Sequence, residues 1–312
     1  MLKGIALSVL ASISFGVLYF YTQLLGALDS QQIFGWRILA TIPCLTVFLW
    51  LIGDLSLIHK VWQRLTANPW LILGLALTSA LSSVQLWLFL WGPVHGRGLQ
   101  VSLGYFLLPL ILVLAGCLIY KEKLSKFQAV AVCFALFGVG FQFWQHGSMA
   151  WETLVVAAGY SLYFILRKKL QTEHLGGFFW DLILCLPVAV YFIVMGEGSL
   201  QYFVQQPSLA LIVLGLGVLS AIGLGSYILA SRQLPLILFG LLSYLEPVLL
   251  ALAALIMGES IAENEWVTYI AIWTAVAILV LEGALHLYRQ QHNRKNLLRN
   301  VERVQHRLKD DA

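Results

Sequence analysis

The chain consists largely of uncharged, apolar runs that are long enough to cross a lipid bilayer. A helix needs about 20 residues to span the hydrocarbon core, because each residue advances the helix by about 1.5 Å. This length rule predicts ten spans, with the boundaries of each defined to within about 2–4 residues. They lie near residues 5–28, 31–53, 70–92, 98–120, 127–145, 149–166, 177–196, 208–230, 234–257 and 266–286.

The composition agrees with a membrane protein and excludes an ordinary soluble domain. Hydrophobic residues make up 60% of the chain and charged residues 11%, whereas a soluble domain is about half apolar and about a quarter charged. The first run, 5–28, exceeds the roughly 7–15 apolar residues of a signal peptide, so we expect it to be retained as a helix. The sequence therefore predicts an all-α integral membrane protein.

The basic residues predict how the chain is threaded through the membrane. With an even number of spans, 17 of the 19 Lys and Arg residues fall on one side. Arg97 lies on the other side, and Arg37 lies within a span. Basic loops face the cytoplasm by the positive-inside rule, so both termini are expected there. The loops near Asp29, His146 and 259–265 are expected outside.

An internal repeat divides the chain into two halves. The run from Trp36 to Pro43 returns from Trp180 to Pro187, a shift of 144 residues, with Asp181 in the place of Arg37. Further matches, at shifts that fall from 144 to 138, are Leu18-Tyr19-Phe20 with Leu162-Tyr163-Phe164, Leu73-Gly74 with Leu214-Gly215, Ser79-Ala80 with Ser220-Ala221, and Pro109 with Pro247. We therefore interpret 1–145 and 146–288 as two copies of a five-helix unit.

Because five is odd, the second copy must enter the membrane from the opposite side, which predicts an inverted repeat. Beyond it, residues 289–312 form a basic tail with Leu297, Leu298, Val301, Val304 and Leu308 at helical spacing. We expect this tail to lie on the anionic inner leaflet. Contact with a partner protein is the alternative.

Several motifs resemble the RarD branch of the EamA family, in the drug/metabolite transporter superfamily. They are Ser102-Leu103-Gly104-Tyr105-Phe106-Leu107-Leu108-Pro109, Lys121-Glu122-Lys123-Leu124-Ser125, Leu166-Arg167-Lys168-Lys169-Leu170, the stretch from Gly240 to Pro247, Gly258-Glu259 and Ile272-Trp273. The resemblance implies a ten-helix permease of the cell inner (plasma) membrane. The chain departs from the family pattern at Gln100, at Gln85-Leu86 and at Glu246, where the family carries Glu, Asn-Trp and a neutral residue.

Two charges within spans are the main candidates for a solute-pathway site. A central arginine costs about 2.5–3.5 kcal/mol in lipid, so Arg37 is expected either to face a cavity or to reach outward to the headgroups. Glu246 lies at nearly the same estimated depth, on the helix arithmetic of about 1.5 Å per residue. We therefore predict that the two pair. The pair would be structural, or Glu246 would exchange its partner for a coupling proton.

Other residues complete the candidate pathway. Asp181 is expected nearer the inner face, where it contacts Lys168 or Lys169 as a gate or brace, or contacts solute. Tyr105 and Tyr244 each precede a proline near midplane depth and could line a cavity, with ordinary packing as the alternative. Trp36 carries the same ambiguity, because tryptophan near a span end is usually an interfacial anchor.

The sequence thus predicts a secondary active transporter that moves a small organic solute, such as an amino acid, metabolite or drug, by alternating access. Expected partners are the solute, a coupling proton and membrane lipid, with no nucleic acid. No nucleotide loop, metal motif or nucleophile elbow is present in the sequence, so we expect neither a cofactor nor enzymatic activity. The alternative function is a non-transporting sensor or scaffold that acts through the basic tail.

Overall fold

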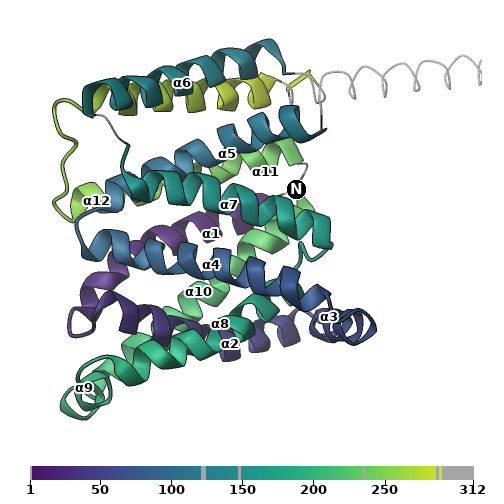
Figure 1. Ribbon diagram of the computed structural model, residues 1–312, viewed down its shortest axis with the longest axis vertical. Coiled ribbons are helices and arrows are strands. Elements are labelled where there is room, and N and C mark those ends of the chain that lie inside the picture. The colour runs from purple at the N-terminus through teal and green to yellow at the C-terminus, as the bar shows by residue number, and fades with distance from the viewer. Residues whose placement is uncertain (1, 121–123, 147–148, 235, 286–287, 290–312) are drawn as a thin grey trace, which may run out of the picture.

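The computed structural model describes residues 2–120, 124–146, 149–234, 236–285 and 288–289, and every regular element in these ranges is a helix (Figure 1). The long helices are α1 (Leu2–Tyr21), α2 (Ser30–Leu51), α4 (Leu71–Val94), α5 (Gly98–Tyr120), α6 (Lys126–His146), α7 (Trp151–Leu170), α8 (Leu175–Met195), α10 (Ser208–Gln233) and a C-terminal helix over Trp266–Leu285. The shorter ones are the 3-10 helix η1 (Thr22–Leu25), α3 (Ser56–Ala67), α9 (Ser199–Gln205), α11 (Leu236–Ser243) and α12 (Leu245–Ile256).

Within the described residues, seven segments are long and apolar enough to cross a membrane, which confirms the membrane class. They are Leu2–Leu25, Ser30–Leu51, Leu71–Val94, Lys126–Gln145, Leu175–Met195, Ser208–Gln233 and Trp266–Leu285. The other three predicted spans coincide with α5, with α7 and with the α11–α12 pair. The count of ten spans stays a prediction, as does the side on which each terminus lies.

The predicted span 234–257 is interrupted, because α11 ends at Ser243 and α12 begins at Leu245. Pro247 explains the position of this break. A proline lacks the backbone N–H that would bind the carbonyl four residues earlier, here that of Ser243, and its ring clashes with that carbonyl. Pro43, Pro109 and Pro187 are accommodated inside continuous helices.

The helices pack in a pattern that follows the repeat in the sequence. Helix α1 packs against α10 and α12, whereas α7 packs against α4 and α5. Helices α2 and α8 pack against each other, α2 also against α10 and α8 also against α4. The repeat aligns α1 with α7, α10 with α4, and α12 with α5, so equivalent helices have equivalent neighbours. At the top of Figure 1, α6 and the C-terminal helix form an outer layer.

Helices α2 and α8, which carry the two repeat-related charged positions Arg37 and Asp181, pack closely against each other, and both charged side chains are buried. A Cβ atom added to Gly35 would lie 2.6 Å from the carbonyl oxygen of Ala189. Glycine is therefore required for the two backbones to approach this closely, as is common where membrane helices pack.

Two short helices were not predicted, and they connect equivalent pairs of long helices. Helix α3 joins α2 to α4, and α9 joins α8 to α10. They lie at opposite ends of the bundle, α3 at the end that also carries the N-terminus (Figure 1). Both helices are too short for the span rule, although Ile58, Val61, Trp62 and Leu65 do recur at helical spacing in α3. The predicted tail helix lies almost wholly outside the described residues.

Candidate functional site

Arg37 lies inside the bundle, in the second turn of α2, and is only 2% exposed. Its Nε donates a hydrogen bond to Ser220 Oγ (3.0 Å), and NH1 donates to the Leu86 carbonyl oxygen (3.3 Å). The guanidinium carbon lies 5.2 Å from the centre of the Phe89 ring. The groups that hold this cation are therefore neutral: a hydroxyl, a carbonyl and an aromatic face.

A pair of tyrosines lies beside Arg37. The Tyr105 and Tyr160 rings have centroids 5.6 Å apart, and their hydroxyl groups hydrogen bond to each other. Phe89 packs edge-on against Tyr105, with 6.2 Å between the ring centroids. Tyr160 lies near enough to both Arg37 and Glu246 to interact electrostatically with each. Tyr160 was not predicted as a site residue.

Glu246 occupies the first turn of α12, directly after the helix break. The ion pairs among the described residues do not include one between Glu246 and Arg37, so the predicted direct contact is not observed. The prediction used depth alone, and depth does not fix the direction in which each side chain leaves its helix. Both charges instead lie near Tyr160.

The remaining predicted aromatics occupy different places. Tyr244 is buried, 8% exposed, at the junction between α11 and α12. Trp36 is half-buried and packs against Phe203 of α9, with 4.6 Å between the ring centroids. Trp36 thus contacts the helix at one end of the bundle, whereas Tyr105 belongs to the cluster around Arg37.

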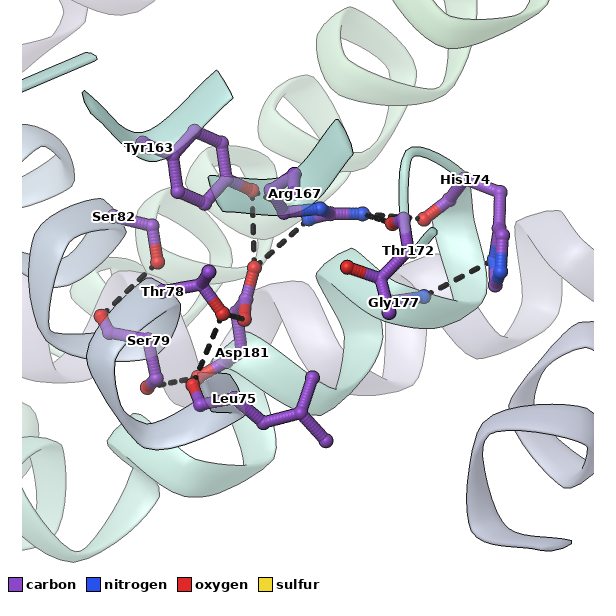
Figure 2. Close-up of polar contacts among 10 residues, drawn as sticks. All are labelled: Leu75, Thr78, Ser79, Ser82, Tyr163, Arg167, Thr172, His174, Gly177 and Asp181. Atoms are coloured by element: carbon purple, nitrogen blue, oxygen red, sulfur yellow. Dashed lines mark hydrogen bonds and ion pairs between the residues drawn. The ribbon is translucent and has the colours of Figure 1, made fainter. Parts of the chain in front are cut away.

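Asp181, the repeat counterpart of Arg37, is surrounded by donors (Figure 2). Its Oδ1 accepts a hydrogen bond from Thr78 Oγ1 (2.7 Å). Its Oδ2 accepts from Tyr163 OH (3.0 Å) and from Arg167 NH1 (2.8 Å). Each carboxylate oxygen therefore has at least one partner, and the group forms a buried ion pair with Arg167.

Arg167 also fixes the connection between α7 and α8. Its NH2 group donates to the carbonyl oxygens of Thr172 and of His174, the latter at 2.8 Å, as Figure 2 shows. The prediction that Asp181 contacts Lys168 or Lys169 is corrected by this arrangement. Both lysines are exposed, while Arg167 points into the bundle on the buried side of α7.

The sequence did contain a signal for this network. Tyr160, Tyr163 and Arg167 recur three and four residues apart, a spacing that places side chains on one face of a helix. From the sequence, Arg167 is predicted only to lie on the cytoplasmic side and to belong to a family motif. The partners Thr78 and Ser79 lie about a hundred residues away on α4, so their contact with Asp181 required the tertiary structure.

Equivalent serines form hydrogen bonds with the two equivalent residues, Arg37 and Asp181. Arg37 donates to Ser220 Oγ, and Ser79 donates to the backbone carbonyl oxygen of Asp181 (2.7 Å). Ser79 and Ser220 are themselves repeat partners in the sequence. The same two repeat positions are therefore hydrogen bonded in both halves, with an arginine at one site and an aspartate at the other.

A second set of polar contacts ties the start of α5 to its neighbours at the end of the bundle far from Arg167. The Glu259 carboxylate accepts from the backbone N–H groups of Gly98 (2.7 Å) and Leu99 (2.8 Å), at the positive end of the helix dipole. Tyr19 OH donates to the Gly98 carbonyl oxygen (2.9 Å). Arg97 forms an ion pair with the buried Glu152 of α7 at 2.6 Å.

His174, in the connection before α8, is surrounded by positive charge. Its Nδ1 accepts a hydrogen bond from the backbone N–H of Gly177 and so caps α8. Burial, and after it the nearby charges of Arg167, Arg232, Arg64 and Lys60, together lower the pKa of His174 to about 4. The neutral imidazole is the form that this position stabilises.

A small polar cavity lies away from Arg37, between α5, α6, α7 and the C-terminal helix. Its volume is about 10 Å³, and it is lined by Gln100, Leu103, Gln142, Met149, Ala150, Thr153, Glu265, Thr268 and Tyr269. A cavity of this size has room for about one water molecule. Gln100 Oε1 and Tyr269 OH, which are both buried, have no hydrogen-bond partner within the described part of the chain.

Groups of three or more metal-ligating side chains do not occur among the described residues. Cys44, Cys133 and Cys185 are free thiols.

Comparison with known proteins places these features in a family. Residues 2–144 match the sequence model of the EamA-like transporter family. The chain is 39% identical to "Chloramphenicol-sensitive protein RarD" of Pseudomonas aeruginosa, over 92% of this chain and 97% of that protein. It is 37% identical to an "uncharacterized transporter" of Pasteurella multocida, over 93% and 99% of the two chains. Escherichia coli "Protein RarD" is 28% identical, over 94% and 98%.

A crystal structure of another protein has the same fold. The two superpose with a TM-score of 0.53 at 16% sequence identity, and the match covers 90% of this chain and 98% of the other. At this identity the likeness concerns the fold alone.

Proposed function

We propose that this chain, which belongs to the EamA-like transporter family and is related to RarD proteins along most of its length, is a secondary active transporter. It would move a small organic solute across the inner membrane by alternating access. The names of the relatives indicate transport, not catalysis, and they do not favour the sensor or scaffold alternative.

The observation that carries this proposal is the buried cluster around Arg37. A guanidinium within a membrane span is costly, and such residues usually line solute or ion pathways. Arg37 is grouped with Tyr105 and Tyr160, and Tyr160 also interacts with Glu246 beside the break between α11 and α12. Broken helices near the midplane are typical of substrate sites in secondary transporters.

Alternating access requires that the two ends of the bundle open in turn, and an inverted repeat provides two such equivalent ends. The equivalent packing of α1 and α7, and the positions of α3 and α9 at opposite ends (Figure 1), support this arrangement. We propose that the Arg167–Asp181 ion pair closes one end. The contacts of Glu259 with Gly98 and Leu99 would close the other.

Glu246 is proposed as the residue that couples transport to a proton. A carboxylate within a span must be paired, protonated or hydrated. Glu246 has no ion pair within the described ranges, so a proton is the simplest way to neutralise it. Exchange of that proton during the cycle would link solute flux to the pH gradient.

Flux measurements in proteoliposomes test the proposal. Purified protein would be reconstituted and assayed with labelled amino acids and with chloramphenicol, which appears in the name of one relative. We expect saturable flux of at least one solute, with counterflow after preloading. Arg37→Gln should abolish this flux, and Glu246→Gln should remove its dependence on an imposed pH gradient.

A matched control separates loss of the site from loss of an arginine in general. Arg232 forms an exposed ion pair with Asp54, so Arg232→Gln should retain flux. Absence of flux for every solute in either direction, from protein that is folded and correctly inserted, would contradict the proposed function.

A further inference from the structure

Arg37 is a buried cation with no counter-charge among the described residues. The ion pairs in this part of the chain are Arg97–Glu152, Arg167–Asp181 and Arg232–Asp54. Removal of a charge from water costs several kcal/mol, on the order of what a well-formed ion pair returns. Arg37 carries this cost with neutral neighbours only, so an anion that binds there would offset it.

The guanidinium also has unused hydrogen-bonding capacity. An arginine presents five N–H donors in one plane. Two have acceptors: Ser220 Oγ at 3.0 Å and the carbonyl oxygen of Leu86 at 3.3 Å, which is beyond the usual range of a strong bond. The other donors can bind an oxyanion, and two parallel N–H groups match the two oxygens of a carboxylate or sulfonate.

The surroundings suit an oxyanion attached to an apolar or aromatic body. Phe89 covers one side of the guanidinium. Of the two hydrogen-bonded hydroxyl groups of Tyr105 and Tyr160, one keeps a proton that it can donate to a third acceptor. Tyrosine and phenylalanine rings supply flat apolar contact area.

The two acidic residues predicted for the pathway, Asp181 and Glu246, do not compete for this role. Asp181 is held by Arg167, Thr78 and Tyr163, and Glu246 is not within ion-pair distance of Arg37. We infer that Arg37 binds an oxyanion group of the transported solute, a carboxylate or sulfonate, and that the Tyr105–Tyr160 pair contacts the same group. This inference rests on the proposed transport function for the solute, but the binding site can be tested without flux.

Thermal unfolding of the purified full-length protein in detergent tests binding directly. Three anionic probes would each be compared with a neutral analogue of similar shape: phenylacetate with phenylacetamide, benzenesulfonate with benzenesulfonamide, and succinate with succinamide. We expect at least one anion to raise Tm in a saturable manner while its neutral analogue does not. Failure of all three pairs to show a difference would overturn the inference.

Variants assign the effect to Arg37. Arg37→Gln should weaken binding of that anion by about 10-fold or more, as expected for loss of a charged hydrogen bond. Arg37→Lys keeps the charge without the planar donors and should weaken it less. Arg232→Gln, at an exposed ion pair with Asp54, is the control and should leave binding intact. Undiminished binding in both Arg37 variants would contradict the inference. If Arg37→Gln does not fold, the same test is made with Arg37→Lys alone, and undiminished binding in that variant would contradict the inference.

The inference and the proposed function fail in distinguishable ways. Anion-specific stabilisation that depends on Arg37, without flux in proteoliposomes, would keep the site and contradict transport. Flux that treats benzenesulfonate and benzenesulfonamide alike, and that Arg37→Gln leaves unchanged, would keep transport and contradict the oxyanion site.

Discussion

Arg37 and Asp181 occupy the same position in the two repeats, yet their surroundings differ in one decisive way. Asp181 has a charged partner in Arg167 and hydroxyl donors in Thr78 and Tyr163. Arg37 is as deeply buried but has a hydroxyl, a carbonyl and an aromatic ring as its described contacts. The described residues therefore neutralise the anion internally and supply no counter-charge for the cation.

This difference suggests a division of labour between the halves. A buried charge whose partners are all supplied by the fold contributes to holding the fold together, and removal of one partner strands the other. A buried charge without a partner is available to a ligand. On this view the second repeat braces one end of the bundle at Asp181, and the first repeat provides the solute site at Arg37.

Asp181→Ala should have the largest effect on stability. The substitution leaves Arg167 buried without its anion, which typically costs about 3–5 kcal/mol. Arg37→Leu removes a cation that has no counter-charge, so we expect its unfolding free energy to change by less than about 1 kcal/mol. Thermal unfolding of the two variants in the same detergent measures the contrast. A larger loss in Arg37→Leu than in Asp181→Ala would reverse the proposed division.

Loss of the hydroxyl partner of Asp181 should destabilise the protein more than loss of the hydroxyl partner of Arg37, and both losses should be smaller than that of Asp181→Ala. Thr78→Val removes a hydrogen bond to a buried carboxylate and should cost about 1.5–3 kcal/mol. Ser220→Ala removes the acceptor of Arg37 Nε and should cost about 1 kcal/mol, because a bound solute or water can replace it. Equal losses in the two variants, measured by thermal unfolding, would show that both charges are braced alike.

The smallest expected effect is a pH dependence at His174. Its pKa is about 4 in the folded protein and about 6.5 in an unfolded chain. The unfolded state therefore binds more protons than the folded state between these two pH values. The contribution of His174 to the free energy of unfolding is thus fully present above pH 6.5 and is lost as the pH falls towards 4. His174→Asn keeps a capping side chain for α8 but does not titrate. Its Tm should fall less than that of the parent protein between pH 7 and pH 5, and an unchanged fall would exclude His174 as the cause.

The sequence by itself determined the class of protein and most of its helices. Each apolar run of about 20 residues can be predicted as a span independently of the others, because a membrane span is defined by its own length and polarity. The repeat can also be detected in the sequence alone, since Trp36 to Pro43 and Trp180 to Pro187 match without a gap. These features identified Arg37 and Asp181 as special positions, and the family motifs indicated a transporter.

Only the tertiary structure decided which groups those positions contact. Depth along a helix follows from counting residues, but the direction of a side chain depends on how each helix is rotated and which neighbour approaches it. The expected Arg37–Glu246 pair failed on this point, and Arg167, instead of Lys168 or Lys169, was selected as the partner of Asp181. The contact between Thr78 and Asp181 joins residues 103 apart in the chain, a distance at which periodicity carries no information about contact.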